Sequence, residues 1–231
     1  MRGYSAAQVR DAEAPLLAAG EPLMRRAAAA LARGIRRELE ATVAASGPVV
    51  LLVGSGDNGG DALFAGAELA DEGVTVIAIP TSVRMHRAGA DAALAAGVGF
   101  VDNSDADAVS AAIESAAVIV DGILGTGTST GTSTAPALRG VARDLVAAAI
   151  PVVARRGIRV VAVDLPSGIH PDDGTVPDAT VLPATVTVTF GAAKAGLLRE
   201  PGARYAGRLD VVDLGLGPHL ARMTPLIETA E

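Results

Sequence analysis

The sequence has no cysteine and no tryptophan, and its aromatic residues are two tyrosines and three phenylalanines. Without cysteine, disulfide bonds and thiolate metal sites are excluded. A binding site must therefore use backbone groups, small side chains and charges rather than aromatic stacking. Nineteen basic residues stand against 26 acidic ones, a net charge of −7, and no basic stripe with interleaved aromatic residues occurs. Such a chain repels a nucleic-acid backbone, so we expect no nucleic-acid partner.

Long apolar runs are also missing, since none approaches the roughly 20 residues that a membrane span requires. We therefore expect a soluble, cytoplasmic protein with no membrane partner. The 231 residues are enough for one α/β domain with a large core. Because no internal repeat and no Pro- or Ser-rich linker divides the chain, we expect a single domain over residues 1–231.

The stretch 49–61 is the most informative part of the chain. Residues 49–53 are all apolar, which predicts a strand buried on both faces. Four glycines between residues 54 and 60 allow a tight turn, and the apolar spacing of residues 61–69 predicts that a helix follows it. Unpaired N–H groups at a helix N-terminus suit a phosphate. A turn without a ligand is the alternative, but such a turn needs neither Asn58 nor Asp61.

Residues 54–59 also match the dinucleotide fingerprint GxGxxG, which is weak on its own. That fingerprint requires an acidic residue at the end of the next strand, where it holds a ribose hydroxyl. The next predicted strand, 74–79, leads into Pro80, Thr81 and Ser82 instead. An ordinary nucleotide-binding oxidoreductase is therefore disfavoured.

The rest of the chain alternates between helical and strand patterns. A capping box at Ser5 predicts a helix that ends before Gly20, and Pro22 opens a second helix whose arginine-rich face is either solvated or binds a partner. Further helices are predicted near 60–72, 87–96, 105–116 and 136–149, and strands at 74–79, 98–101, 117–121, 159–164, 185–190 and 208–212. This alternation predicts an α/β fold, a three-layer α/β/α sandwich with a Rossmann-like, mostly parallel sheet and helices on both faces. The N-terminal helices, about residues 5–45, are expected to pack on it.

Polar residues follow three of the predicted strands, each beside a glycine-rich segment: Asn58 and Asp61, then Asp121, then Asp164 and Ser167. Ligands of open parallel sheets bind outside the carboxyl ends of the strands, so these loops converge if the strands are neighbours. Oxygen atoms of Asn58, Asp121 and Ser167 would suit a hard cation. Taken singly, such residues more often begin turns.

Two further features leave alternatives open. The Gly/Thr/Ser-rich run 125–134 is either a flexible loop or a cradle of backbone amides and hydroxyls for a diphosphate. Lys194 follows the strand 185–190; a lysine there is more often solvated, but it could neutralise a phosphate or transfer a proton. The three histidines have no metal-ligand spacing, and we assign them no function.

Five segments together resemble the NAD(P)H-hydrate epimerases, the YjeF N-terminal domain family: EPLMRRAAAALA at 21–32, GSGDNGGDA at 54–62, VDGILGTG at 120–127, VDLPSGI at 163–169 and TVTFGAAKAGLL at 187–198. The resemblance implies an isomerase that interconverts the R and S forms of NADH or NADPH hydrated at C6 of the nicotinamide ring. It also implies a partner dehydratase, separate or fused, that acts on the S form. A homodimer formed through the N-terminal helices is expected from the family.

The resemblance also implies the site residues. By position, the first substrate-binding loop is Asp57, Asn58, Gly59, Gly60 and Asp61, and the second is Gly125, Thr126, Gly127, Thr128, Ser129, Thr130 and Gly131. Asn58, Asp121 and Ser167 are implied as ligands of a potassium ion, and Asp164 as a substrate contact. Because inversion of C6 needs a proton delivered and removed, we assign the acid–base step to Asp164, with Lys194 assisting or binding phosphate.

Four positions depart from the family pattern: Asp57 for asparagine, Ala62 for glycine, Gly122 for alanine and His170 for aspartate. Asp57 adds a negative charge beside the expected phosphate site. The dehydratase segment that follows in many bacterial members does not occur in these 231 residues, so we expect either that the protein acts alone or that the sequence is a fragment. A catalytically reduced dimeric scaffold or ligand-binding module of the same fold is the alternative, but a scaffold has no use for clustered oxygen donors.

Overall fold

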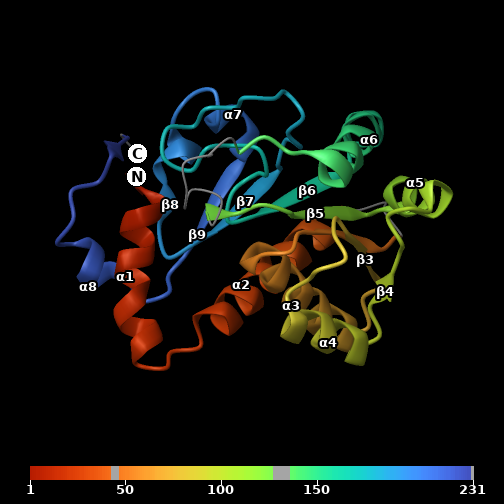
Figure 1. Cartoon of the computed structure of the whole chain (residues 1–231), viewed down its shortest axis with the longest axis horizontal. Coiled ribbons are helices and arrows are strands. Elements are labelled where there is room, and N and C mark those ends of the chain that lie inside the picture. The colour runs from red at the N-terminus through yellow and green to blue at the C-terminus, as the bar shows by residue number, and fades with distance from the viewer. Residues whose placement is uncertain (43–46, 127–135, 230–231) are drawn as a thin grey trace.

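A seven-stranded sheet forms the centre of the computed structural model, which describes residues 1–42, 47–126 and 136–229 (Figure 1). From edge to edge the strands are β4 (Gly99–Phe100), β3 (Val76–Pro80), β2 (Val49–Val53), β5 (Val118–Gly122), β6 (Arg159–Val163), β7 (Val186–Phe190) and β9 (Arg208–Val212). Every neighbouring pair is parallel. The predicted parallel sheet is confirmed, and each predicted strand is present.

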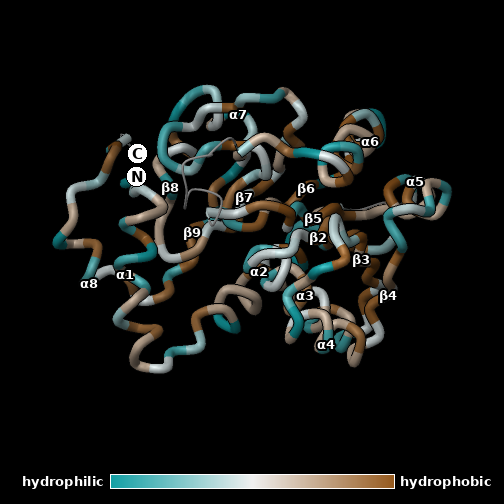
Figure 2. The backbone as a smooth tube through the Cα atoms, viewed as in Figure 1, coloured by the Kyte–Doolittle hydropathy of each residue, from teal (hydrophilic) through white to brown (hydrophobic). Residues whose placement is uncertain are grey.

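Helices cover both faces of this sheet. One layer contains α2 (Leu23–Glu40), α3 (Asp57–Asp71) and α4 (Arg87–Ala95), and the other contains α5 (Ala106–Ser115) and α6 (Gly140–Arg156) (Figure 1). Along β2, Val49 and Leu51 pack in the first layer's core, whereas Val50 and Leu52 pack in the second. Because both faces are covered, the strand is an unbroken apolar run (Figure 2). The three-layer α/β/α architecture is therefore confirmed.

Helix α3 begins earlier than predicted, at Asp57 rather than near residue 60. The prediction placed Gly59 and Gly60 in a turn, but both lie in the first turns of the helix. A Cβ atom on Gly59 would come 2.0 Å from the Gly54 carbonyl oxygen, and one on Gly60 would come 2.8 Å from the His86 ring. These glycines therefore let the helix N-terminus pack tightly against its neighbours.

Helix α1 (Ala6–Ala18) confirms the predicted capping box. Gln8 N donates to Ser5 Oγ at 3.0 Å, and Ser5 N donates to the Gln8 Oε1 at 2.9 Å. Helix α2 also begins where Pro22 predicts. In contrast, α6 continues beyond the predicted residue 149, through Pro151, until Gly157 ends it in a left-handed conformation with φ of 65°. Proline removes only one intrahelical hydrogen bond, which the packed helix tolerates.

A second, three-stranded sheet was not predicted. It pairs β1 (Arg2–Tyr4) with β8 (Ala193–Lys194) in parallel and with β10 (Ile227–Glu228) in antiparallel orientation. Strands of two or three residues carry no periodic signal, so the sequence pattern could not reveal them. The N- and C-terminal segments lie side by side in this sheet, close to β8 (Figure 1). Three short helices complete this side: η2 (Ala195–Leu198), α7 (Ala203–Ala206) and α8 (Gly217–Leu220).

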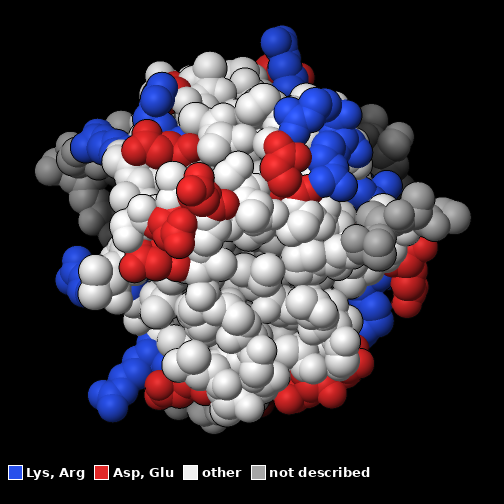
Figure 3. All heavy atoms as spheres, turned by 90° about the vertical axis from the view of Figure 1, so that its right-hand side faces the viewer, with Lys and Arg blue, Asp and Glu red and all other residues white. Residues whose placement is uncertain are grey.

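The surface carries charges of both signs. On the face shown in Figure 3, basic and acidic side chains lie in mixed groups around a broad area without charged side chains. In the part of the chain that the structure describes, no helix combines the length and apolar character needed to cross a membrane.

Candidate active site

The candidate site lies at the carboxyl ends of β2 and β5, the two adjacent strands from which the chain continues to opposite edges of the sheet. From β2 the chain continues to β3 and β4 on one side, and from β5 it continues to β6 and β7 on the other. In such sheets the crevice between the two halves, at the carboxyl ends of the strands, is the usual ligand site. Strand β5 pairs with both β2 and β6. The start of α3 with Asn58, the end of β5 with Asp121 and the loop after β6 with Ser167 therefore meet.

Asp121 and Ser167 form a buried pair. Ser167 Oγ donates to Asp121 Oδ1 at 2.6 Å, and Ser167 N donates to Asp121 Oδ2 at 2.8 Å. Burial raises the pKa of Asp121, although the hydrogen bonds from Ser167 and from Ile123 N oppose this. Leu124 N donates to Ser167 Oγ at 2.9 Å, which ties the loop after β5 to the loop after β6.

Asn58 joins these two loops to α3. Its Nδ2 donates to Val163 O at 2.5 Å and to Leu124 O at 3.1 Å. A Cβ atom on Gly125 would come 2.1 Å from Asn58 Oδ1, so glycine is required there for this side chain to fit. The amide is buried among backbone groups of three adjoining segments.

The chemistry of these oxygen donors fits a cation of low charge. Asn58 offers an amide oxygen, Ser167 a hydroxyl and Asp121 a buried carboxylate, all of which hard cations prefer. Asp121 has no basic partner among the described residues; its contacts are Ser167 and Ile123. Within those same ranges, no group of three or more His, Cys, Asp or Glu side chains could hold a metal ion. A single carboxylate with neutral oxygens suits a monovalent ion better than a divalent one.

Asp164 and Lys194 form a second buried pair. Lys194 Nζ donates to Asp164 Oδ1, to Phe190 O at 2.8 Å and to Thr189 Oγ1 at 3.2 Å. The same Oδ1 accepts from Phe190 N and from Thr189 Oγ1, each at 3.1 Å. Lys194 is only 2% exposed, which excludes the alternative of a solvated lysine. Lys194 lies in β8 opposite Tyr4 of β1, a pairing that the sequence does not reveal.

Asp164 also has an unusual backbone. Its φ is 67°, in the left-handed region, and it is the one non-glycine residue with positive φ among the described residues. That conformation costs about 1–2 kcal/mol for a residue with a Cβ, although aspartate tolerates it better than most. Asp164 N donates to Val188 O at 2.8 Å, which helps to hold it. Strain of this kind is concentrated at functional sites.

Asp57 and Asp61 lie on the first turns of α3, so the expected first loop is a helix start. Together with Asn58 and residues 123–126, Asp57 lines a cavity of about 310 Å³. Asp61 is buried, and its Oδ1 is the one buried side-chain oxygen or nitrogen without a hydrogen-bond partner in the described part of the chain. Burial, then the negative charges of Asp164, Asp57 and Glu13, raise the pKa of Asp61 well above its usual value; Lys194 opposes this.

The remaining expected residues divide into three groups. Gly59 and Gly60 serve close packing, whereas Gly125 and Thr126 line the cavity. Gly127, Thr128, Ser129, Thr130 and Gly131 lie outside the described residues. Two of the histidines serve local structure: His86 caps α4 by accepting from Gly89 N at 3.1 Å, and His170 Nδ1 accepts from Asp172 N at 3.3 Å.

Sequence reasoning missed Glu13. This partly buried residue of α1 interacts electrostatically with Lys194, Asp164, Arg10 and Asp57. Burial raises its pKa, and Lys194 is the largest opposing influence. Nothing in the sequence pattern places α1 at the strand ends, because the contact depends on the unpredicted sheet of β1 and β8.

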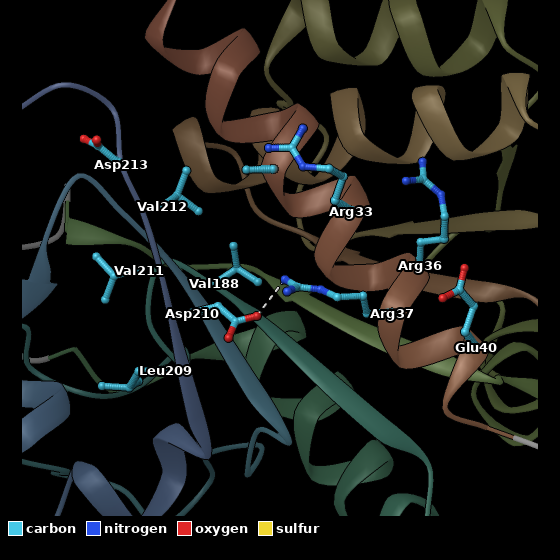
Figure 4. A pocket seen from close by; sticks show the side chains of 11 residues that line it. Arg33, Arg36, Arg37, Glu40, Val188, Leu209, Asp210, Val211, Val212 and Asp213 are labelled. Carbon is cyan, nitrogen blue, oxygen red and sulfur yellow. Dashed lines mark hydrogen bonds and ion pairs between the residues drawn. The ribbon is translucent and has the colours of Figure 1, made fainter. Parts of the chain in front are cut away.

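A larger cavity of about 750 Å³ lies elsewhere, between α2 and the edge strand β9 (Figure 4). Arg37 Nη2 donates across it to Asp210 Oδ2 at 2.7 Å, and Arg36 pairs with Glu72 at its rim. The arginine-rich face of α2 is thus partly engaged with neighbouring acidic residues. Exposed pairs of this kind contribute little stability, and the cavity contains none of the residues predicted for the site.

Comparisons with known proteins agree on one family. The family model for the YjeF-related protein N-terminus matches residues 20–196. The NAD(P)H-hydrate epimerase of Clavibacter michiganensis subsp. michiganensis is 54% identical over 99% of this chain and 96% of its own length. The protein of the same name from Microbacterium testaceum is 50% identical over 98% of this chain and 84% of its own length.

More distant relatives are larger or less similar. The bifunctional NAD(P)H-hydrate repair enzyme Nnr of Mycobacterium leprae is 39% identical over 92% of this chain, which covers 41% of that protein. The crystal structure of yeast ynu0 shares the fold, with a TM-score of 0.71 and 19% identity over 87% of this chain and 86% of the yeast chain.

Proposed function

Because the chain belongs to the family of the YjeF-related protein N-terminus, we propose that it is an isomerase that interconverts the R and S forms of C6-hydrated NADH and NADPH. The observation that carries this proposal is the 54% identity, over 99% of the chain, to a relative named NAD(P)H-hydrate epimerase. The site described above supplies chemical groups that such a reaction needs.

Asp164 is the proposed acid–base residue. Inversion at C6 requires either that the C–O bond is broken and remade or that the ring opens and recloses, and a proton is moved in both cases. Every hydrogen bond that Asp164 accepts in the described part of the chain goes to Oδ1. Oδ2 is therefore the oxygen left for the substrate, while Lys194 holds the carboxylate in place.

The N-terminus of α3 is the proposed site for the phosphate groups. Its first two residues, Asp57 and Asn58, border the 310 Å³ cavity together with Gly125 and Thr126. The unpaired N–H groups and the positive end of the helix dipole favour an anion there. The carboxylate of Asp57 opposes this attraction, so we expect the substrate to approach the backbone and not this side chain.

A potassium ion is proposed at Asn58, Asp121 and Ser167. When bound, it would balance the buried charge of Asp121 and hold the loops after β2, β5 and β6 together. The donor set described above supports this ion. No proton transfer is assigned to these three residues.

We further propose a place in cofactor repair. The Mycobacterium leprae relative is named a bifunctional repair enzyme, and this chain matches 41% of its length. A dehydratase acting on the S form would therefore complete the repair, as a separate or a fused protein. We also propose that the protein acts in the cytoplasm as a homodimer.

The decisive test supplies the purified protein with the R hydrate of NADPH and follows the S form by chromatography, in potassium and in sodium buffers. We expect the S form to accumulate, and faster in potassium. Asp164→Asn should slow the reaction by about 10²–10⁴-fold, the usual contribution of a general acid–base group. Asp91→Asn, on the exposed face of α4, serves as the matched control.

Each part of the proposal can be contradicted independently of the others. If the parent protein forms no S hydrate in potassium, the proposed function is wrong. If Asp164→Asn works at the parent rate, Asp164 does not transfer the proton. Equal rates in potassium and sodium would remove the proposed role of the ion.

A further inference from the structure

Epimerisation needs a proton donor and a proton acceptor at the same time. If the C–O bond at C6 breaks, the oxygen leaves with the bonding electron pair and takes up a proton, so that water departs and N1 shares the positive charge. A water molecule then forms the new C–O bond on the other face and gives up a proton. If the ring opens instead, the hydroxyl loses a proton and N1 gains one. In both routes one proton is given to the substrate and one is taken from it. The site must therefore hold one protonated and one ionised group.

Asp164 can supply only one of these groups. Its ion pair with the buried Lys194 requires the ionised form, and two further donors hold the same oxygen. Asp164 is therefore ready to accept a proton. The donor must be another group close to this pair.

Asp61 has the properties of that donor. It shares one face of α3 with Asp57 and Asn58, since residues three and four apart lie on the same side of a helix. It is only 6% exposed, and its Oδ1 has no hydrogen-bond partner in the described part of the chain. A buried carboxyl group in which one oxygen lacks a hydrogen-bond partner favours its neutral form, in which it can donate a proton.

Glu13 reaches the same region from α1. Strand β1 places Tyr4 opposite Lys194, and α1 starts two residues later, at Ala6. On this helix Arg10 Nη1 donates to Thr126 O at 3.3 Å, which holds one face of α1 against the loop after β5. Glu13 lies three residues after Arg10, on that face, and is only partly buried.

From these positions we propose that Asp61 is the second acid–base group of the site, which holds its proton while Asp164 acts in its ionised form, and that Glu13 is the neighbouring carboxyl group whose charge acts on it. This inference rests on the proposed epimerase function. Asp61 is the buried donor, and the negative charge of Glu13 favours its protonated form. The charged groups that face this pair are Arg10 on α1, Asp57 on α3, Asp164 after β6 and Lys194 on β8.

The electrostatics of the pair agree with this assignment. The pKa values of both Glu13 and Asp61 are raised, in each case mainly by burial. The negative charge of Glu13 contributes to the raised pKa of Asp61. Removal of that charge should therefore let Asp61 lose its proton at lower pH.

The test compares the pH dependence of kcat for the parent, Glu13→Gln, Glu13→Asp and Asp11→Asn. Activity of the parent should fall at high pH, when Asp61 loses its proton. In Glu13→Gln this fall should move to lower pH by roughly one unit, the lower end of the effect of a neighbouring charge on a carboxyl group. Glu13→Asp should restore the parent profile. Asp11→Asn, an exposed carboxylate on the same helix, should leave it unchanged.

A second measurement does not depend on the reaction. Titration of ¹³C-labelled aspartate side chains by NMR should show a lower pKa for Asp61 in Glu13→Gln than in the parent, and no change in Asp11→Asn. An active parent whose kcat profile and Asp61 titration are both unaffected by Glu13→Gln would overturn this inference alone. An inactive parent would overturn the proposed function and with it this inference.

Discussion

The pairing of Lys194 with Asp164 dominates the site at the level of single residues. Lys194→Met leaves a buried carboxylate without its cation, which typically costs about 3–5 kcal/mol of unfolding free energy. In the double variant with Asp164→Asn no charge remains, so the loss should be smaller than the sum of the two single losses. Urea unfolding of all three variants measures this.

Arg204→Met provides the control, because Arg204 is 72% exposed in its pair with Glu200. This change should alter stability by less than about 1 kcal/mol. If Lys194→Met proves as mild as Arg204→Met, the pair with Asp164 is not the buried contact described here.

Gly125 is a second residue whose identity the site requires. In Gly125→Ala the new Cβ would meet Asn58 Oδ1 at 2.1 Å, so the Asn58 side chain must move and lose its bonds to Val163 O and Leu124 O. Leaving such buried groups unsatisfied costs about 1–3 kcal/mol. We expect lower stability and a higher KM, measured by urea unfolding and by the epimerisation assay.

Gly56→Ala is the matched control for the effect on stability, because a Cβ on Gly56 would meet nothing within 4 Å. Its φ of −97° is also accessible to alanine. A Gly125→Ala protein with parent KM and stability would show that the site tolerates a displaced Asn58.

Among the elements, α1 depends on its capping box. Ser5→Ala removes the acceptor for Gln8 N, which typically costs about 0.5–2 kcal/mol. Ser110→Ala, on the exposed side of α5, should stay within about 0.5 kcal/mol of the parent. Urea unfolding compares the two, and equal effects would mean that this cap does not stabilise the protein.

Most of the secondary structure was predictable because it follows from local patterns. The buried run 49–53 and the capping box at Ser5 are properties of a few adjacent residues, and both were found as expected. The start of α3 was placed too late, since glycines usually break helices and only the close contacts of Gly59 and Gly60 explain their use within one. The short strand β8 had no local signal at all.

The same distinction explains which site residues could be predicted. Asn58, Asp121 and Ser167 lie at or just after the carboxyl ends of strands. In a parallel sheet these ends meet at one edge, so the convergence of the three residues could be expected. The burial of Lys194 and the approach of Glu13 depend on β1 and β8, which pair segments about 190 residues apart in sequence. No local pattern encodes such a contact.

For the whole molecule, buried carboxyl groups predict how stability changes with pH. Since the folded-state pKa of Asp61 is raised, the native protein binds this proton more tightly than the unfolded chain does. Its contribution to stability is full below the unfolded pKa of about 4, and it is lost as the pH rises through the folded value. Asp61→Asn lacks this titration, so relative to the parent it should be more stable at pH 8 than at pH 4.

Urea unfolding at both pH values tests this, with Asp91→Asn as the exposed control. Burial raises the pKa of Asp121 as well, so the Asp61→Asn variant should keep part of the pH dependence of stability. A difference between Asp61→Asn and the parent that is the same at pH 4 and pH 8 would contradict the prediction.

The three-stranded sheet of β1, β8 and β10 brings the two ends of the chain close together. Met1 N donates to Thr229 O at 2.7 Å, and β1 lies between the C-terminal strand β10 and the strand that carries Lys194. A short peptide that joins the two ends, with a new opening at the exposed turn around Gly73, should therefore give a permuted protein that still folds and binds. Conversely, a bulky tag at either end would lie close to the small sheet that contains Lys194. We therefore expect the position of a purification tag to affect activity.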